Sequence, residues 1–278
     1  MPLDPLQLTL PAVLALGYGR RALTLRRRAR PVPALRIACF GVGIAILAVA
    51  LASPLHELGE RRLSFHMAQH VLLGDLAPLF LLAGLTGPLL RPLLAVGALA
   101  RLRALANPLL ALPLWAVNLL LWHLPVLYGA AVRHDAVHVL EHACFFAAGL
   151  VLWLPVLETM PAPAWFGTGP KIGYVVGAWM VGSVLGNVLL WAAGSPLYGV
   201  YAHRAGVDAL EDQRLAGAVM LGEGLAVTAG VLVWLALRLV QEAELRQRLL
   251  EGGTPPRIAR RAVRYGRRLP GGPRPSAR

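Results

Sequence analysis

Charged residues are scarce in this chain. Only 15% of its 278 residues are Asp, Glu, Lys or Arg, 57% are hydrophobic, and the mean hydropathy is +0.60. Soluble domains carry about a quarter charged residues, so the composition excludes an ordinary soluble domain and predicts a polytopic membrane protein. The net charge of +13 then reports on membrane topology, and no nucleic-acid partner is expected.

Cysteine is nearly absent as well. Cys39 and Cys144 both lie in apolar stretches, and neither belongs to a CxxC motif. This excludes a disulfide framework and a thiolate copper motif. Adjacent His-His pairs, which are common in membrane di-metal oxygenases, are also missing. An enzyme of that class is therefore the least favoured interpretation, and we expect no enzymatic activity.

What the chain does contain is a series of apolar segments separated by Pro, Gly and Arg. We predict seven membrane-spanning helices, at roughly 6–25, 34–52, 64–84, 107–127, 135–154, 172–193 and 213–238. The segment 85–106 is expected to be a loop with a short interfacial helix. The expected fold class is an all-α seven-helix bundle formed by residues 1–250, followed by a basic, disordered tail over 251–278.

The basic residues decide the predicted orientation. With the amino terminus outside, all but five of the 27 Lys and Arg residues fall in inner segments, as the positive-inside rule requires. The carboxy terminus is then cytoplasmic. All eight histidines fall at or near the outer surface under this topology, which predicts an outer face suited to holding a cation.

Four of these histidines form two pairs with helical spacing. His66 and His70 lie one turn apart in the third predicted span, and His138 and His142 lie one turn apart in the fifth, at similar depths. Residues at i and i+4 share one face of a helix, and neutral imidazole is the commonest side-chain metal ligand. Two such helices facing each other predict a metal site, although the spacing does not distinguish copper, zinc, iron or haem.

Other polar residues surround these pairs. Glu141 is placed to accept a ring N–H from a ligating imidazole and so to orient it. Met67 and Gln69 flank the first pair, and the thioether of Met67 is a donor suited to Cu(I). These neighbours favour a metal site without identifying its ion.

Two acidic residues fall near the middle of predicted spans. Asp75 and Glu223 lie about eleven residues below the outer membrane surface, with no deep Lys or Arg to pair with them. Intramembrane carboxylates are costly and often functional, so they form either an intramembrane relay for a proton or cation or a structural polar contact. The sixth span carries two GxxxG motifs, which allow close helix packing and leave a homodimer open.

The residues around the histidines resemble the CtaG-type family of membrane proteins associated with assembly of caa-type cytochrome c oxidase. The resemblance covers roughly residues 10–240 and rests on four blocks, which are Ser64–Leu73, Trp122–Tyr128, His138–His142 and Asp212–Met220. The chain departs from the family pattern at Asp75, Leu221 and Glu223.

The resemblance implies a multipass protein of the bacterial cytoplasmic membrane that supplies copper, as Cu(I) or Cu(II), to the copper B centre of the oxidase catalytic subunit. Its partners would be that subunit, the lipid bilayer and a periplasmic or extracellular copper donor. The metal ligands carried over are His66, His70, His123, His138, His142, Met67 and Asp212, with Glu141, Gln69 and Gln213 around them.

Two other functions satisfy the same sequence. A b-type haem protein would take one axial histidine from the third span and one from the fifth. A copper or cation transporter would use Asp75 and Glu223 as its inner path.

Overall fold

The computed structural model describes residues 8–52, 54–97, 101–191, 194–202 and 208–265, and all regular structure in these ranges is helical. The first half of the chain forms α1 (Thr9–Arg27), α2 (Ala34–Ala52), α3 (Leu55–Arg61), α4 (Leu63–Val71), the π-helical turn η1 (Leu72–Leu76), α5 (Ala77–Gly84), α6 (Gly87–Leu94) and the 3₁₀ turn η2 (Arg101–Ala106). The second half forms α8 (Pro108–Trp122), α9 (Pro125–Arg133), α10 (Asp135–Leu157), α11 (Thr168–Trp191), the 3₁₀ turn η3 (Gly199–Tyr201), α12 (Ala209–Glu251) and α13 (Pro256–Tyr265).

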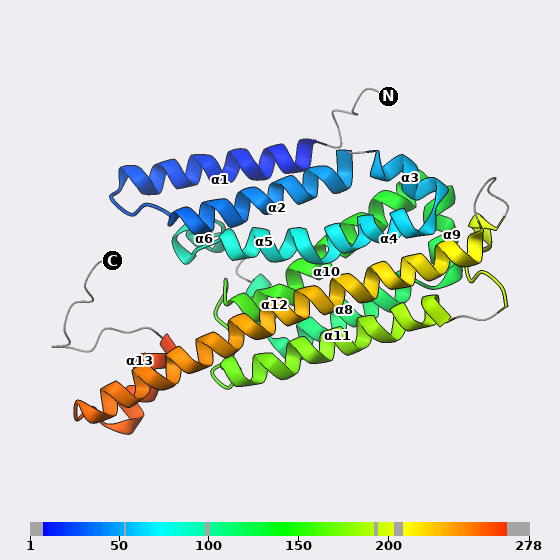
Figure 1. The fold of residues 1–278 in the computed structure, drawn as a ribbon. Coiled ribbons are helices and arrows are strands. Elements are labelled where there is room, and N and C mark those ends of the chain that lie inside the picture. Colours follow the sequence, from blue (N-terminus) through cyan, green and yellow to red (C-terminus); the bar gives the residue numbers. More distant parts are fainter. Residues whose placement is uncertain (1–7, 53, 98–100, 192–193, 203–207, 266–278) are drawn as a thin grey trace.

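The long helices lie side by side along one direction (Figure 1). α4, η1 and α5 follow one another as a single rod, and α10 packs against this rod and against α8. α1 and α2 cover one side of the bundle, whereas α11 lies on the other and packs along α12. Large apolar side chains such as Leu35, Val117 and Trp191 are more than half exposed, as expected for helices that face lipid.

Length and composition identify five of these helices as candidate membrane spans, namely α2, α4 to α5, α10, α11 and α12. α8 and α9 make a sixth if they are counted as one span with a bend of 69°. The bend falls at Pro125, which lacks an N–H and disfavours helix at the preceding residue. Within the described residues, each of the seven predicted segments contains a membrane-length or shorter helix. α1 is not among the candidate spans, and four arginines lie in its second half. The apolar helices support a membrane protein, and a count of seven spans stays a prediction.

The C-terminal region differs from the sequence-based expectation. α12 continues for 43 residues to Glu251, well past the expected end at 238, because its last turns are rich in helix-forming Leu, Gln, Glu and Arg. Pro256–Tyr265 is helical, so the expected disorder is wrong there. Arg264 explains this, since it bonds to Glu158 at 2.9 Å and to the carbonyl of Phe166 at 2.7 Å. Residues 266–278 lie outside the described part of the chain.

Glycines allow two close helix contacts. A Cβ on Gly149 of α10 would lie 2.1 Å from the carbonyl oxygen of Gly74 in η1, so these backbones touch directly. A Cβ on Gly217 of α12 would lie 2.6 Å from the carbonyl oxygen of Gly186 in α11. Gly186 belongs to a GxxxG motif, and it packs against α12 of the same chain. The homodimer that this motif left open therefore stays an untested prediction.

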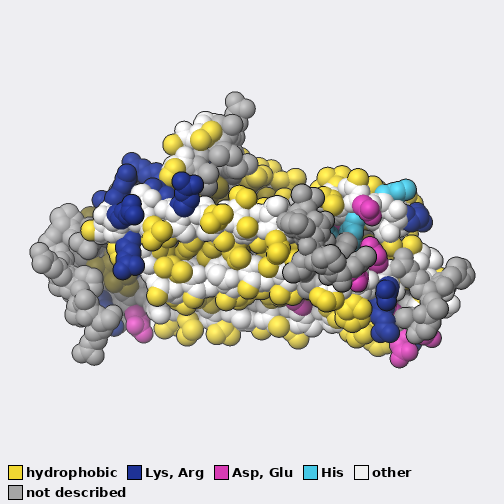
Figure 2. Space-filling view, turned by 90° about the horizontal axis from the view of Figure 1, so that it is seen from above, with side chains coloured by type: hydrophobic (Ala, Val, Ile, Leu, Met, Phe, Trp, Pro, Cys, Tyr) yellow, Lys and Arg dark blue, Asp and Glu magenta, His cyan; other side chains and the backbone are white. Residues whose placement is uncertain are grey.

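Charge separates along the length of the molecule. Figure 2 shows most Lys and Arg side chains at one end, hydrophobic side chains along the middle, and histidine with several acidic side chains at the opposite end. This distribution is the one that the positive-inside rule associates with a cytoplasmic basic end. It supports the predicted orientation, which stays a prediction.

Candidate metal centre

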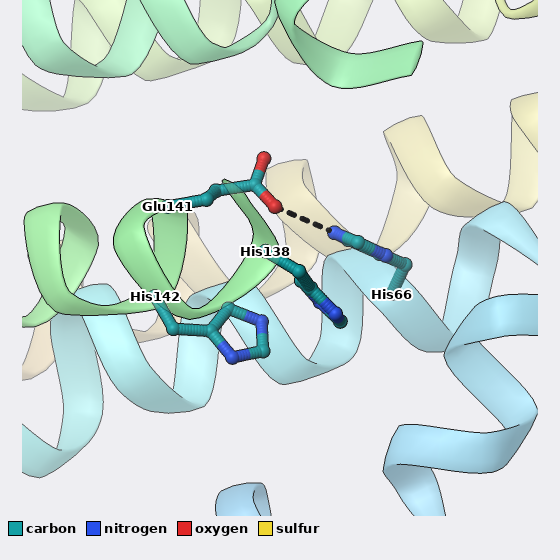
Figure 3. A group of neighbouring side chains, drawn as sticks. All are labelled: His66, His138, Glu141 and His142. Carbon is teal, nitrogen blue, oxygen red and sulfur yellow. Dashed lines mark ion pairs between the residues drawn. The ribbon is translucent and has the colours of Figure 1, made fainter. Parts of the chain in front are cut away.

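Two helices bring three imidazoles and one carboxylate together. His66 comes from α4, and His138, Glu141 and His142 come from successive turns of α10 (Figure 3). One ligand atom from each lies within 4.8 Å of the other three. The first HxxxH pair contributes His66 to this group, and the second contributes both of its histidines.

The group is buried away from solvent. His66 is 1% exposed and Glu141 is 0% exposed. The Nε2 atoms of His66 and His142 and both carboxylate oxygens of Glu141 are buried without a hydrogen bond. Buried polar atoms of this kind normally have a partner, and these four residues could together hold a metal ion.

One distance in the group matches the separation expected between two ligands of a single metal ion. Ligands of a tetrahedral ion at about 2 Å lie about 3.3 Å from one another, and the Nε2 of His66 is already 3.4 Å from Oε2 of Glu141. The His66 and His138 rings are stacked with centroids 5.1 Å apart, and the His138 and His142 centroids are 4.2 Å apart. Glu141, predicted to orient the ligands, lies within the ligand group itself.

His70 borders this group without joining the four. Its Nε2 lies 3.5 Å from Oε2 of Glu141, and its ring centroid lies 4.3 Å from that of His66. Neither of its ring nitrogens has a hydrogen bond of good geometry, and its side chain is 4% exposed. Glu141 therefore lies against both histidines of the first pair.

His123 occupies the C-cap of α8, immediately before the bend at Pro125. Its Nδ1 lies 2.8 Å from the carbonyl oxygen of Leu119. Because a carbonyl only accepts, Nδ1 carries the hydrogen, and the buried Nε2 keeps a free lone pair. The His123 and His70 ring centroids are 6.1 Å apart. His123 thus lies next to His70 and outside the four-residue group.

Met67 and Asp212 do not belong to the group. Met67 is fully buried among apolar side chains that include Tyr128, Leu189 and Ala216. Asp212 accepts hydrogen bonds from the backbone N–H of Leu63 at 2.6 Å and from the hydroxyl of Ser64. The structure therefore places Asp212 at the start of α4, where it holds the helix that carries His66.

Gln69 and Gln213 also connect helices. Gln69 donates from Nε2 to the carbonyl oxygen of Ala50 at the end of α2, at 2.8 Å. Gln213 accepts from the backbone N–H of Leu197 at 2.6 Å and donates to the carbonyl oxygen of Leu189 at 3.2 Å. Both side chains position the helices around the centre.

Three tyrosines that the sequence did not single out form one wall of the centre. The Tyr128 ring centroid lies 5.0 Å from that of His66, and its hydroxyl lies 3.2 Å from that of Tyr201. Tyr198 donates to the carbonyl oxygen of His123 at 3.0 Å. Tyr198 and Tyr201 follow α11 at the end of the bundle that holds the histidines, and no spacing pattern links them to the histidine motifs.

The sequence model of the cytochrome c oxidase caa3 assembly factors (Caa3_CtaG) matches residues 16–242. The chain belongs to this family. The match extends from α1 into α12 and includes every residue of the centre. No curated protein and no solved structure matches the chain. Assembly factors of this family are not typically catalytic.

The two deep acids of this Caa3_CtaG protein meet below the histidines. Asp75 lies in η1 and Glu223 lies in α12, and their side chains are hydrogen bonded to each other. Trp153 of α10 donates to Oδ1 of Asp75 at 2.6 Å. A cavity of about 100 Å³ joins this pair to His70 and His123, which line its other end. The sequence predicted the depth of the acids but not their contact.

Proposed function

We propose that this Caa3_CtaG protein binds copper between α4 and α10 and delivers it to the copper B centre of the oxidase catalytic subunit. The observation that carries the proposal is the convergence of His66, His138, Glu141 and His142 in one buried group. Family membership supports the oxidase as the partner. The charge distribution supports a donor on the outer, periplasmic side of a bacterial cytoplasmic membrane.

Delivery requires that ligands exchange one at a time rather than close permanently around the ion. His70, His123 and Met67 line the cavity beside the four-residue group. They offer two further imidazoles and a thioether, which are donors suited to copper and especially to Cu(I). An ion leaving the four-residue group would therefore meet new ligands before losing all the old ones.

The haem alternative is weaker. A haem between the third and fifth spans needs a slot for the macrocycle between η1 and α10, just below His70 and His142. The backbones touch there, because a Cβ on Gly149 would lie 2.1 Å from the carbonyl oxygen of Gly74. A Soret band in protein purified from haem-replete cells would revive this alternative.

Cation transport is a second candidate function, and one observation favours it. The cavity leads from His70 and His123 down to Asp75 and Glu223, and it has room for several water molecules. The carboxyl pair would serve as an intramembrane relay for a proton or cation. Transport and delivery share the outer histidine group and differ in whether the ion crosses the membrane.

Copper loading of the purified protein tests the binding proposal. Wild type is expected to retain copper after desalting, whereas His138→Ala loses most of it because a ligand is removed. His134→Ala is the matched control, since His134 is exposed and lies one turn earlier, at the N-cap of α10. Equal loading of wild type and His138→Ala would refute the site.

Delivery is tested in membranes of a deletion strain. Complementation with wild type or His134→Ala is expected to restore oxidase activity and the copper content of the catalytic subunit, and His138→Ala is expected to restore neither. Full restoration by His138→Ala would refute delivery from this group.

A further inference from the structure

The basic end of the molecule carries two adjoining hollows that the proposed function does not use. The first is an apolar groove of about 680 Å³ between α1 and α2 on one side and α5 and α10 on the other. Leu14 and Gly17 of α1, Leu85 beyond α5 and Leu150 of α10 are among its lining residues. Its walls are almost wholly hydrocarbon, with Arg21 at one end.

The second hollow is a basic pocket of about 1070 Å³ formed by α1, α6 and η2. Arginines dominate its lining, and they are Arg21, Arg28, Arg30, Arg91 and Arg103. No Asp or Glu of the described chain lines this pocket. Five like charges around one hollow repel one another, so an anion in the pocket would relieve that repulsion.

Arg21 and Pro92 line both hollows, so the apolar groove opens directly into the basic pocket. Arg21 donates from Nη2 to the carbonyl oxygen of Pro88 at 2.9 Å, and its Nε is buried without a hydrogen bond. The guanidinium of Arg21 therefore lies where the groove meets the basic pocket, and its Nε–H has no hydrogen-bond acceptor. Together, the two hollows have an apolar lining along the helices and a cationic lining at the basic end of the molecule.

We propose that the two hollows together bind one anionic phospholipid, with an acyl chain in the apolar groove and the phosphate headgroup among the arginines. Clusters of basic residues next to membrane spans attract anionic headgroups. A free phosphate would occupy the basic pocket but leave the apolar groove unfilled, and an uncharged lipid would leave the arginines unpaired. The bound lipid would tie α1, which packs mainly on α2 and α6, to α5 and α10.

Native mass spectrometry of the full-length protein, incubated with phosphatidylglycerol or phosphatidylcholine, tests the headgroup. Wild type is expected to retain one phosphatidylglycerol and to bind phosphatidylcholine much more weakly. Changing Arg28, Arg91 and Arg103 to Gln is expected to weaken retention about 100-fold, at about fivefold for each basic residue. The matched control changes Arg246, Arg248 and Arg257, which are exposed arginines of the same basic end.

A second variant tests the groove without altering charge. Gly17 lines the groove, and a Cβ there meets nothing within 4 Å, so Gly17→Phe would place a ring in the space of the acyl chain. Gly19, on the same helix, is equally open and does not line the groove, which makes Gly19→Phe the control. Gly17→Phe is expected to lose the lipid, and Gly19→Phe to keep it.

Three results would overturn the proposal. The first is equal retention of phosphatidylglycerol by wild type and by the variant at Arg28, Arg91 and Arg103. The second is equal retention by Gly17→Phe and Gly19→Phe. The third is displacement of the lipid by millimolar inorganic phosphate alone. Copper loading is independent of these measurements, because no residue of the histidine group lines either hollow.

Discussion

Asp212 holds the first turn of α4 by accepting the backbone N–H of Leu63 at 2.6 Å. The first N–H groups of a helix have no partner within the helix, and a carboxylate at that end also interacts favourably with the helix dipole. Because His66 lies one turn further along α4, this bond from α12 fixes where His66 meets α10. The family block that contains Asp212 is therefore explained by positioning rather than by metal ligation.

Asp212→Ala is expected to lower the free energy of unfolding by about 1–3 kcal/mol, the usual effect of losing a cap or a buried hydrogen bond to a charged group. Thermal unfolding in detergent measures the change. Copper bound at saturation should stay at the wild-type level, with weaker affinity. Asp212→Asn keeps one acceptor oxygen, so its stability should lie between those of wild type and Asp212→Ala. Complete loss of copper with wild-type stability would instead make Asp212 a ligand.

The part of the centre that could be predicted from the sequence is the part set by residue spacing within a single helix. The spacing of His138 and His142 placed both rings on one face of α10, and the similar depth of His70 predicted that the first pair lies opposite. The structure brings His66 of that pair into the group. The roles of Asp212 and Gln213 depend on bonds to backbone groups distant in the chain. Spacing within one segment contains no information on such partners.

Other features arise from tertiary contacts or local breaks in the helix. The π-helical turn at Leu72–Leu76 contains Asp75, and its position beside Gly149 and Trp153 follows from packing against α10. α13 was expected to be disordered because it lies in a stretch rich in Pro, Gly and Arg, yet it is helical and contacts Glu158 and Phe166. In η1 and in α13, contacts with other helices therefore decide the local structure more than the composition of the segment does.

Gly149→Ala is expected to destabilise the protein by about 1–3 kcal/mol, the usual range for overpacking. The added methyl group would lie 2.1 Å from the carbonyl oxygen of Gly74, so α10 must move away from η1. Gly173→Ala on α11 is the control, because a Cβ there meets nothing within 4 Å and alanine favours helix by about 0.4–1 kcal/mol. Chemical or thermal unfolding of both variants provides the measurement. Equal stabilities would contradict the direct backbone contact.

Glu223→Gln separates delivery from transport. If the pair with Asp75 forms a cation path, copper uptake into sealed proteoliposomes containing wild type should exceed that of empty vesicles and fall at least tenfold in the variant. Copper bound at the histidine group should be unchanged, since Glu223 is not one of its four residues. Glu244→Gln, an exposed change on the same helix, controls for altered charge. Absence of flux in well-sealed wild-type vesicles would leave delivery as the function.

Glu158 provides a pH-dependent contribution to stability at the basic end. It follows the last turn of α10 and pairs with Lys171 at 2.9 Å, Arg238 at 3.2 Å and Arg264 at 2.9 Å. Partial burial acts to raise the pKa of Glu158, but these three cations outweigh it and hold the pKa below its ordinary value of 4.5. A carboxyl group with a lowered pKa in the folded state stabilises the protein fully above pH 4.5, and this stabilisation disappears as the pH falls through the lowered value.

Glu158→Gln is therefore expected to lower stability by about 2 kcal/mol near pH 7, and its difference from wild type should shrink below about pH 4.5. Melting temperatures of both proteins across pH 3 to 8 would show the two curves converging on the acid side. Glu244→Gln serves again as the control, because Glu244 is 60% exposed and its pair with Arg248 should contribute little. Parallel curves for wild type and Glu158→Gln over the whole range would mean that Glu158 is not ionised against its three partners, and the attachment of α13 through Arg264 would then need another explanation.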